Sequence, residues 1–199
     1  MIERSTDPTL LATGQLVILI DRVPSDVDVF LRWRTHGEWR LWDAPWEGGM
    51  DALTPEQELE YRELFVSRLE REAPSPRHRA VITTKDGKPL GWVNRYAPEH
   101  SPEDLHLGID ICEDEYLNRG FGTEALWLWL DYLFANSDAH RISLGTWSFN
   151  DRMMCVAEKV GFTRECRQRE MREWQGEWID YVSYGLLRIE WEARRSEGL

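Results

Sequence analysis

A short loop containing two glycines has the composition and the neighbours expected of a phosphate-binding site. Gly120 and Gly122 lie in this loop. Residues 105–111 before it alternate between apolar and polar, as in a half-buried strand, and residues 126–134 after it are apolar enough for a buried helix. A strand that turns through glycines into a helix directs several backbone N–H groups, and the positive end of the helix dipole, at one point. The segment therefore predicts a site that binds phosphate groups.

The spacing of the loop excludes two common phosphate-binding loops. It has no Gly-Lys-Ser/Thr ending, which a nucleoside-triphosphate loop requires, and no Gly-x-Gly-x-x-Gly pattern of a dinucleotide fold. A second block at residues 150–162 begins with Asn150 and ends in Glu-Lys-Val-Gly-Phe. Together the two blocks resemble the GNAT superfamily of acyl-CoA-dependent N-acetyltransferases, and within it the RimJ/RimL-like branch of ribosomal-protein N-terminal acetyltransferases.

The resemblance implies that acetyl-CoA (coenzyme A) is the co-substrate. In this family the cofactor strand diverges from the next strand and leaves a V-shaped gap for the pantetheine arm. Backbone groups of the strand would bind the arm and the loop would hold the pyrophosphate, which gives the cofactor-binding set Ile109, Asp110, Ile111, Arg119, Gly120, Phe121, Gly122, Thr123 and Asn150. Asn150 is also expected to act in catalysis near the thioester, and helix capping alone is its alternative role. The loop departs from the family in beginning with Leu117 rather than Gln or Arg, and Arg119 can supply a cation instead.

Acetyl transfer to an amine requires a neutral nitrogen, so the site needs a proton acceptor. Near pH 7 a lysine-like amine with a pKa of about 10.4 loses its proton at a cost of about 4.6 kcal/mol, compared with about 1 kcal/mol for a peptide α-amine. His106 is the candidate general base, because imidazole exchanges protons near neutral pH and many family members carry Glu there. Its side chain should share a strand face with Gly108 and Asp110. An ordinary solvent-facing histidine is the alternative, and Asp43 and Glu47 are further candidate bases.

The helix after Asn150 offers no proton donor for the departing CoA thiolate. Many family members carry a Tyr seven residues after the Asn, or a Ser on the same face, whereas this face carries Met153, Met154 and Ala157. The general acid is therefore unassigned. Its absence motivates a second hypothesis, a non-catalytic acyl-CoA-binding or sensing module.

A loop rich in aromatic residues, at residues 39–49, is the candidate acceptor site. Exposed tryptophans imply contact with a ligand, and carboxylates among aromatic rings can bind a cation. The residues expected to bind the acceptor are Trp42, Asp43, Trp46 and Glu47. The acceptor is expected to be a primary amine, either a protein N-terminal amine, a polyamine or an amino sugar. Other tryptophans are expected in the core, namely Trp92, Trp127, Trp129, Trp147 and Trp178.

The rest of the chain supplies elements that would position these groups. Strands are expected at residues 16–20, 80–84, 90–96, 105–111 and 141–147, followed by a hairpin of residues 164–174 and 177–187. Residues 54–57 form a capping box that begins a helix, and residues 85–88 predict a hairpin turn. This order predicts an α/β (α+β) fold with a single mixed, mostly antiparallel central sheet, a splayed V-shaped gap and helices on both faces. Residues 1–199 are expected to form one GNAT-like domain.

Composition fits a soluble cytoplasmic enzyme. The 199 residues carry a formal net charge of −12, with 36 acidic and 24 basic side chains, which disfavours nucleic-acid binding and favours cationic partners. No apolar run reaches membrane-spanning length and no leader is visible, so no membrane or nucleic-acid partner is expected. The three cysteines lack metal-ligand spacing and are expected to be reduced thiols, with no metal site. A homodimer is the remaining partner expectation.

Overall fold

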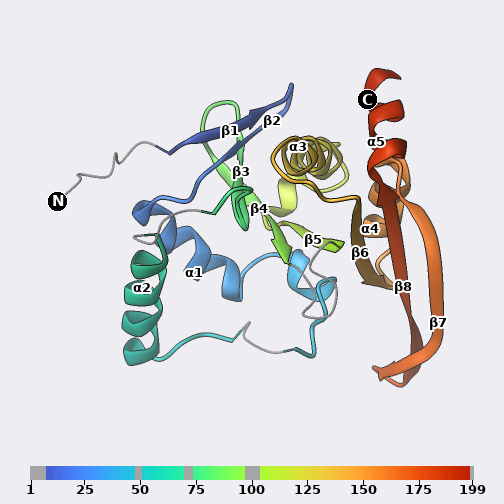
Figure 1. Cartoon of the computed structure of the whole chain (residues 1–199). Coiled ribbons are helices and arrows are strands. Elements are labelled where there is room, and N and C mark those ends of the chain that lie inside the picture. The colour runs from blue at the N-terminus through green and yellow to red at the C-terminus, as the bar shows by residue number, and fades with distance from the viewer. Residues whose placement is uncertain (1–7, 48–50, 70–73, 97–103, 198–199) are drawn as a thin grey trace.

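An eight-stranded sheet runs through the structure in the order β1-β2-β3-β4-β5-β6-β8-β7 (Figure 1). The computed structural model describes residues 8–47, 51–69, 74–96 and 104–197. The strands are β1 (Leu10–Thr13), β2 (Val17–Ile20), β3 (Arg79–Thr84), β4 (Pro89–Tyr96), β5 (Asp104–Ile111), β6 (Arg141–Trp147), β7 (Thr163–Trp174) and β8 (Glu177–Leu187). The helices are α1 (Val27–Thr35), α2 (Pro55–Leu69), α3 (Phe121–Ala135), α4 (Asp151–Val160) and α5 (Arg188–Glu197), with 3-10 turns η1 (Pro24–Asp26), η2 (Glu38–Leu41) and η3 (Asp114–Tyr116).

The contact between β5 and β6 is short, and it is parallel whereas the other neighbouring strands of the described sheet pair antiparallel. Residues 104–106 of β5 face residues 141–143 of β6. Beyond them β5 stays paired with β4 up to Ile111, and β6 stays paired with β8 up to Trp147. The two strands therefore diverge at the centre of the sheet. This arrangement confirms the predicted mixed, mostly antiparallel sheet with a gap.

Helices cover both faces of the sheet, as predicted. α3 lies on one face, where Trp129 is fully buried in a cluster that includes Leu105 and Leu107 of β5. α1 lies on the other face, where Phe30 packs on Trp92 of β4 with ring centroids 5.5 Å apart. Within the part of the chain that the structure describes, no helix combines the length and apolar character needed to cross a membrane.

Several local predictions are confirmed by hydrogen bonds and turns. The backbone N–H of Thr54 donates to Gln57 Oε1 at 2.9 Å and that of Gln57 donates to Thr54 Oγ1 at 3.3 Å, so the capping box begins α2. Residues 85–88 turn β3 into β4, and residues 175–176 turn β7 into β8. The strand expected at residues 16–20 is β2. β1 before it was not expected, because its sequence Leu-Leu-Ala-Thr shows no alternation of apolar and polar residues.

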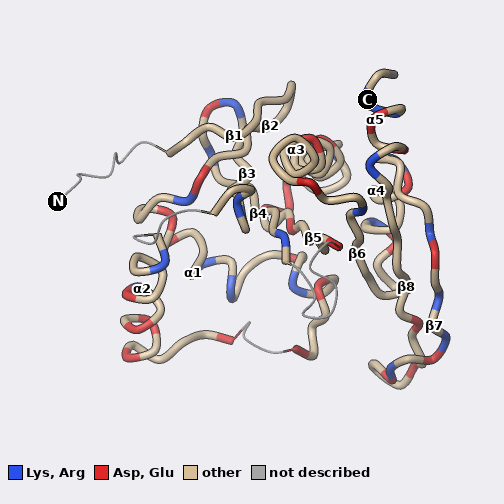
Figure 2. Tube along the Cα trace, viewed as in Figure 1, with Lys and Arg blue, Asp and Glu red and all other residues tan. Residues whose placement is uncertain are grey.

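The expectation that Trp178 is buried is wrong. Its side chain is 60% exposed, because it lies near the tip of the β7–β8 hairpin, where the sheet extends past the helices (Figure 1). β7 forms the outer edge of the sheet and alternates between basic and acidic residues along much of its length (Figure 2). These charges, and the irregular register of β7 with β8, discourage pairing with the edge of another sheet.

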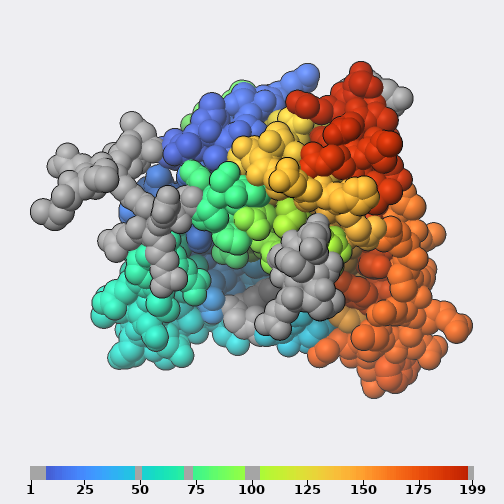
Figure 3. All heavy atoms as spheres, in the orientation of Figure 1, coloured from blue at the N-terminus to red at the C-terminus, as the bar shows by residue number. Residues whose placement is uncertain are grey.

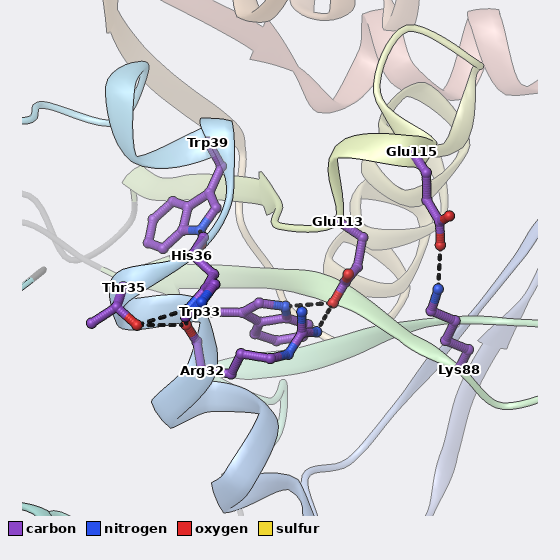
Figure 4. Close-up of polar contacts among 8 residues, drawn as sticks. All are labelled: Arg32, Trp33, Thr35, His36, Trp39, Lys88, Glu113 and Glu115. Carbon is purple, nitrogen blue, oxygen red and sulfur yellow. Dashed lines mark hydrogen bonds and ion pairs between the residues drawn. The ribbon is translucent and has the colours of Figure 1, made fainter. Parts of the chain in front are cut away.

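A single carboxylate fastens the start of α3 to the turn between β1 and β2. Glu124 accepts the backbone N–H groups of three consecutive residues at 2.7, 2.7 and 2.8 Å, namely Gln15, Leu16 and Val17. A second carboxylate fastens α1 to the end of β5. Glu113 accepts Trp33 Nε1 at 2.7 Å and forms an ion pair with Arg32 (Figure 4). Both anchors hold the ends of elements that border the gap.

Replacing Glu124 with Ala should destabilise the fold. Three backbone N–H groups would lose a charged acceptor, and because water can reach part of this site we expect the free energy of unfolding to fall by about 2–3 kcal/mol. Urea unfolding measures the change. Glu192→Ala is the matched control, because Glu192 is exposed on α5 and its loss should change stability by less than about 0.5 kcal/mol. A Glu124→Ala protein as stable as the wild type would contradict the anchoring role.

Candidate active site

A cavity of about 640 Å³ opens where β5 and β6 diverge. Its walls come from β4, β5, β6, β8 and α4, from the loop before α3, and from residues of the 39–47 segment. Figure 3 shows α2 and the β7–β8 hairpin projecting on either side of the central strands. The volume is typical of a small-molecule site.

The loop before α3 has the backbone shape that an anion site needs. Asn118 and Gly120 both adopt positive φ angles, 56° and 88°, and turn the chain so that α3 begins at Phe121. N–H groups in the first turn of a helix have no partners within it. Here the Glu124 N–H donates to the Gly120 carbonyl at 3.0 Å, and the amides just before Glu124 remain available to a phosphate, which the helix dipole also favours.

Most residues expected to bind the cofactor line the cavity, namely Ile109, Asp110, Ile111, Gly120, Gly122, Thr123 and Asn150. Arg119 and Phe121 are not among the lining residues. Arg119 Nη1 donates to the carbonyl of Glu115 at 2.9 Å, and Phe121 packs edge-on against Tyr116 with ring centroids 4.9 Å apart. Both side chains brace the loop from outside, and their direct contact with the cofactor stays a prediction.

Both polar atoms of the Asn150 side chain form hydrogen bonds. Its Oδ1 accepts the Met153 N–H at 3.0 Å, which caps α4, and its Nδ2 donates to the Trp42 carbonyl at 3.1 Å. Arg152 reinforces this link, because its guanidinium lies 4.8 Å from the centroid of the Trp42 ring and pairs with Glu38 at 2.9 Å. The start of α4 is therefore tied to the acceptor loop. The expected catalytic role of Asn150 near the thioester stays a prediction.

The candidate acceptor residues divide into two groups. Three of them line the cavity, namely Trp42, Asp43 and Glu47. Trp46 is not among the lining residues and packs against Trp147 and Trp174 with ring centroids 4.8 and 5.1 Å apart. Arg172 lies 4.5 Å from its ring centroid. Trp46 thus holds the loop against the β7–β8 hairpin, while residues 48–49 of the expected loop lie outside the described residues.

Three carboxylates that line the cavity have no ion-pair partner among the described residues. In the described part of the chain, the side chains of Asp43, Glu47 and Asp110 form no hydrogen bond or ion pair. Burial raises the pKa of Asp110 well above its usual range, the charge of Asp43 raises it further, and Arg79 opposes the shift. Asp43 is open at the cavity mouth, yet desolvation and then the charge of Glu47 raise its pKa as well. No cation among the described residues forms an ion pair with a carboxylate on this side of the cavity.

His106 lies on the predicted strand face but outside the cavity lining. Its Nε2 is 3.3 Å from Asp104 Oδ2, and its ring is 5.3 Å from the ring of Tyr96, which does line the cavity. Proton transfer from an amine in the cavity to His106 would need a relay past Tyr96 or through water. The role of His106 as the general base stays a prediction.

Two glycines bring unexpected polar side chains to the cavity. A Cβ on Gly108 would lie 2.8 Å from Asn94 Oδ1, and a Cβ on Gly145 would lie 1.8 Å from the Tyr181 hydroxyl. Both side chains line the cavity. Burial raises the pKa of Tyr181, so its hydroxyl keeps its proton at neutral pH and can donate it to a departing thiolate. The available sequence signal was a glycine inside a strand, which marks the close approach of another group.

The chain belongs to the GNAT acetyltransferase family, because residues 17–163 match the family model of the acetyltransferase (GNAT) domain. The SPbeta prophage-derived uncharacterized N-acetyltransferase YokL of Bacillus subtilis (strain 168) is 23% identical over 144 residues, which cover 72% of this chain and 78% of that protein. A protein of the same organism named "Probable N-acetyltransferase YjcK" is 28% identical over 123 residues, 62% of this chain and 67% of the relative.

Solved acetyltransferase structures share the fold, as two examples show. An acetyltransferase (GNAT family) from Bacillus anthracis superposes with a TM-score of 0.70 at 19% identity, covering 92% of this chain and 100% of that chain. Spermidine N-acetyltransferase from Vibrio cholerae, crystallised with CoA and spermine, gives a TM-score of 0.69 at 20% identity and covers 88% of this chain and 98% of its own. At these identities the likeness concerns the fold alone.

The protein is an acetyl-CoA-dependent N-acetyltransferase, as its family membership and relatives show. Its residues suit acetyl-CoA, because the free amides at the start of α3 can hold the pyrophosphate and the divergence of β5 from β6 leaves room for an extended arm. A Cβ on Gly122 would approach Ile111 Cγ1 to 3.4 Å, so the loop already lies close to β5. Acetyl-CoA supplies an activated thioester, and the chain holds and orients it.

Replacing Gly120 with Ala should weaken CoA binding. Gly120 has a φ of 88°, and a side chain in this region costs about 1–3 kcal/mol, which we expect to move the loop amides and raise the Kd for CoA about tenfold or more. Isothermal titration calorimetry measures the Kd.

Gly87→Ala is the matched control for this prediction. Gly87 has nearly the same φ, 87°, but lies in the β3–β4 turn, where a Cβ would have no other group within 4 Å. It should lose comparable stability and keep the wild-type Kd for CoA. Equal loss of affinity in both variants would contradict a specific role for the loop before α3.

Proposed function

We propose that the protein transfers the acetyl group of acetyl-CoA to a primary amine that carries further positive charge, as a polyamine does. The observation that carries this proposal is the set of cavity carboxylates without a partner in the described chain, Asp43, Glu47 and Asp110. An acceptor with more than one ammonium group would neutralise them. Trp42 adds an aromatic surface that can contact a cation. The Vibrio cholerae spermidine N-acetyltransferase, whose crystals hold spermine, supports the same acceptor class.

A protein N-terminal amine is the second candidate acceptor. It is supported by the resemblance to the RimJ/RimL-like branch and by the Bacillus subtilis (strain 168) protein YdaF, provisionally named a ribosomal N-acetyltransferase, which is 26% identical over 110 residues, 55% of this chain and 60% of that protein. An α-amine is also cheaper to deprotonate than an alkyl amine. An amino sugar is a third acceptor that would satisfy the acidic cavity.

The proposed reaction is direct attack of the neutral amine on the thioester, without a covalent enzyme intermediate. The acidic side of the cavity binds and orients the amine, and the loop before α3 holds the cofactor. His106 and Asn150 are the residues that the sequence predicts to act in catalysis. Family membership favours this reaction over the alternative of a non-catalytic acyl-CoA sensor.

A screen of amine acceptors tests the proposed function. The wild-type protein with acetyl-CoA should release free thiol with spermidine at least about tenfold more efficiently, in kcat/KM, than with a neutral peptide carrying a free N-terminus, since each added ion pair of about 1.4 kcal/mol contributes one factor of ten. An aminoglycoside covers the amino-sugar class. Tight binding of acetyl-CoA without thiol release from any amine would overturn the proposal and favour the sensor.

Replacing Trp42 and Trp46 separately tests the acceptor loop. Because Trp42 lines the cavity and Trp46 packs outside it, Trp42→Ala should raise the KM for the acceptor about tenfold, in keeping with the loss of one desolvated cation–π contact. Trp46→Ala should raise it less and lower the Tm more. Steady-state kinetics and thermal unfolding measure the two effects. An unchanged acceptor KM in Trp42→Ala would remove this residue from the acceptor site.

A further inference from the structure

We infer that Asp110 binds the ammonium end of the acceptor and takes its proton, with Asp43 as the second carboxylate at the same position. The inference rests on the proposed function and assigns residues to its proton-transfer step. It gives the side chain of Asp110 a role distinct from the backbone contact that the family resemblance implies.

The position of Asp110 is the first argument. It lies on β5 beyond the last residue that pairs with β6, so its side chain borders the gap. It faces Trp92 of β4, on the side of the sheet where α1 and η2 pack and away from the cluster around α3. The loop before α3 and the candidate acceptor loop of residues 39–47 both line the same cavity. Asp110 is therefore a side chain of the cofactor strand that points to the acceptor side.

The second argument is a set of acceptor atoms that have no donor within the described chain. Asp110 and Asp43 are acceptors without partners in the described chain, and the buried Asn94 Oδ1 opposite Gly108 also has no donor. All three residues line the cavity. Acceptor atoms that have no donor within the described chain suit a ligand that only donates. A primary ammonium group, with three N–H donors and no acceptor, has this chemistry.

The surrounding charges make Asp110 a better base than an ordinary aspartate. Three groups near Asp110 carry no positive charge, namely Asp43 and Glu47 of residues 39–47 and the buried Cys112 after β5. The cation that acts on Asp110 is Arg79 on β3. Burial and the charge of Asp43 raise the pKa of the Asp110 carboxyl against the effect of Arg79. A higher pKa of the Asp110 carboxyl lies closer to the pKa of the amine, so proton transfer from the ammonium to Asp110 costs less free energy.

The proton balance of the step needs no further reactant. One N–H bond of the ammonium breaks as an O–H bond forms on Asp110, and the freed lone pair of the amine forms the N–C bond to the acetyl carbon. The C–S bond breaks, and the second proton of the nitrogen passes to the sulfur. The products are the acetamide and CoA thiol, and Asp110 returns its proton to solvent.

Asp110→Asn tests the inference, because it removes the charge and keeps the shape. With spermidine as the probe near pH 7, kcat/KM should fall about 100-fold or more, as expected for loss of a general base, while calorimetry should give an unchanged Kd for CoA. Asp138→Asn is the matched control, since Asp138 is exposed between α3 and β6, and it should keep wild-type kinetics and affinity.

The pH profile separates a proton acceptor from a merely structural residue. In the wild type, kcat/KM should fall as the pH drops through the raised pKa of Asp110, because the protonated carboxyl cannot accept a proton. Asp110→Asn should not show this fall of kcat/KM at low pH. The difference in kcat/KM between this variant and the wild type should shrink toward about pH 10, where the amine is already largely neutral.

Protein stability gives a readout that is independent of activity. Because folding raises the pKa of Asp110, the folded state holds this proton more tightly than the unfolded state does. The wild type should therefore lose stability as the pH rises from the ordinary aspartate range through the raised pKa of Asp110. Asp110→Asn should lose less, and its Tm should exceed that of the wild type near about pH 8.

Two results would overturn the assignment while leaving the proposed function intact. One is an active wild type with unchanged kcat/KM in Asp110→Asn. The other is a fall of kcat/KM at low pH that disappears in His106→Ala and persists in Asp110→Asn, because this outcome would make His106 the base. A wild type that binds CoA and acetylates no amine would instead overturn the proposed function and this assignment with it.

Discussion

The geometry of the active site depends on how far β5 and β6 remain hydrogen-bonded. Their pairing ends after residues 106 and 143, and each strand then continues with its other neighbour. The facing edges of β5 and β6 present backbone donors and acceptors that require partners. At the rim of a sheet such edges invite aggregation, but inside this fold they form the wall of a cavity where an extended amide-rich arm can pair with them.

The sequence predicted the elements that local rules determine. The loop before α3, the caps of α2 and α4 and two hairpin turns follow from the positions of Gly, Thr, Asn and Asp, because these residues act on the backbone next to them. Contacts that depend on tertiary packing were not predictable in this way. Tyr181 reaches the cavity from β8 because residue 145 is glycine, and Trp46 turns away because three aromatic rings receive it. Trp178 resembled a core residue in sequence, and its exposure follows from the length of the hairpin.

Charges of opposite sign lie on different walls of the cavity. Arg152 and Lys159 line it from α4, and the unpaired carboxylates line it from β5 and the acceptor loop. Burying a carboxylate without a partner destabilises a folded protein, and such groups are concentrated at functional sites. Elsewhere in the described chain, many acidic residues have cationic partners, as Glu165 has Arg141 and Asp21 has Arg77. Asp110 differs from these paired groups, because it has no such partner in the described chain and burial raises its pKa, whereas Asp43 and Glu47 are exposed.

The bond from Asn150 to the Trp42 carbonyl has a consequence for the thermodynamics of recognition. Loops that become ordered only when a ligand arrives reduce its affinity by the conformational entropy that they lose. Here the segment carrying Trp42 is immobilised from two directions, by the amide of Asn150 and by Arg152 and Glu38. The conformational entropy of this segment is lost when the chain folds rather than when a ligand binds, so ordering of the segment subtracts less from the binding free energy of a ligand that contacts it.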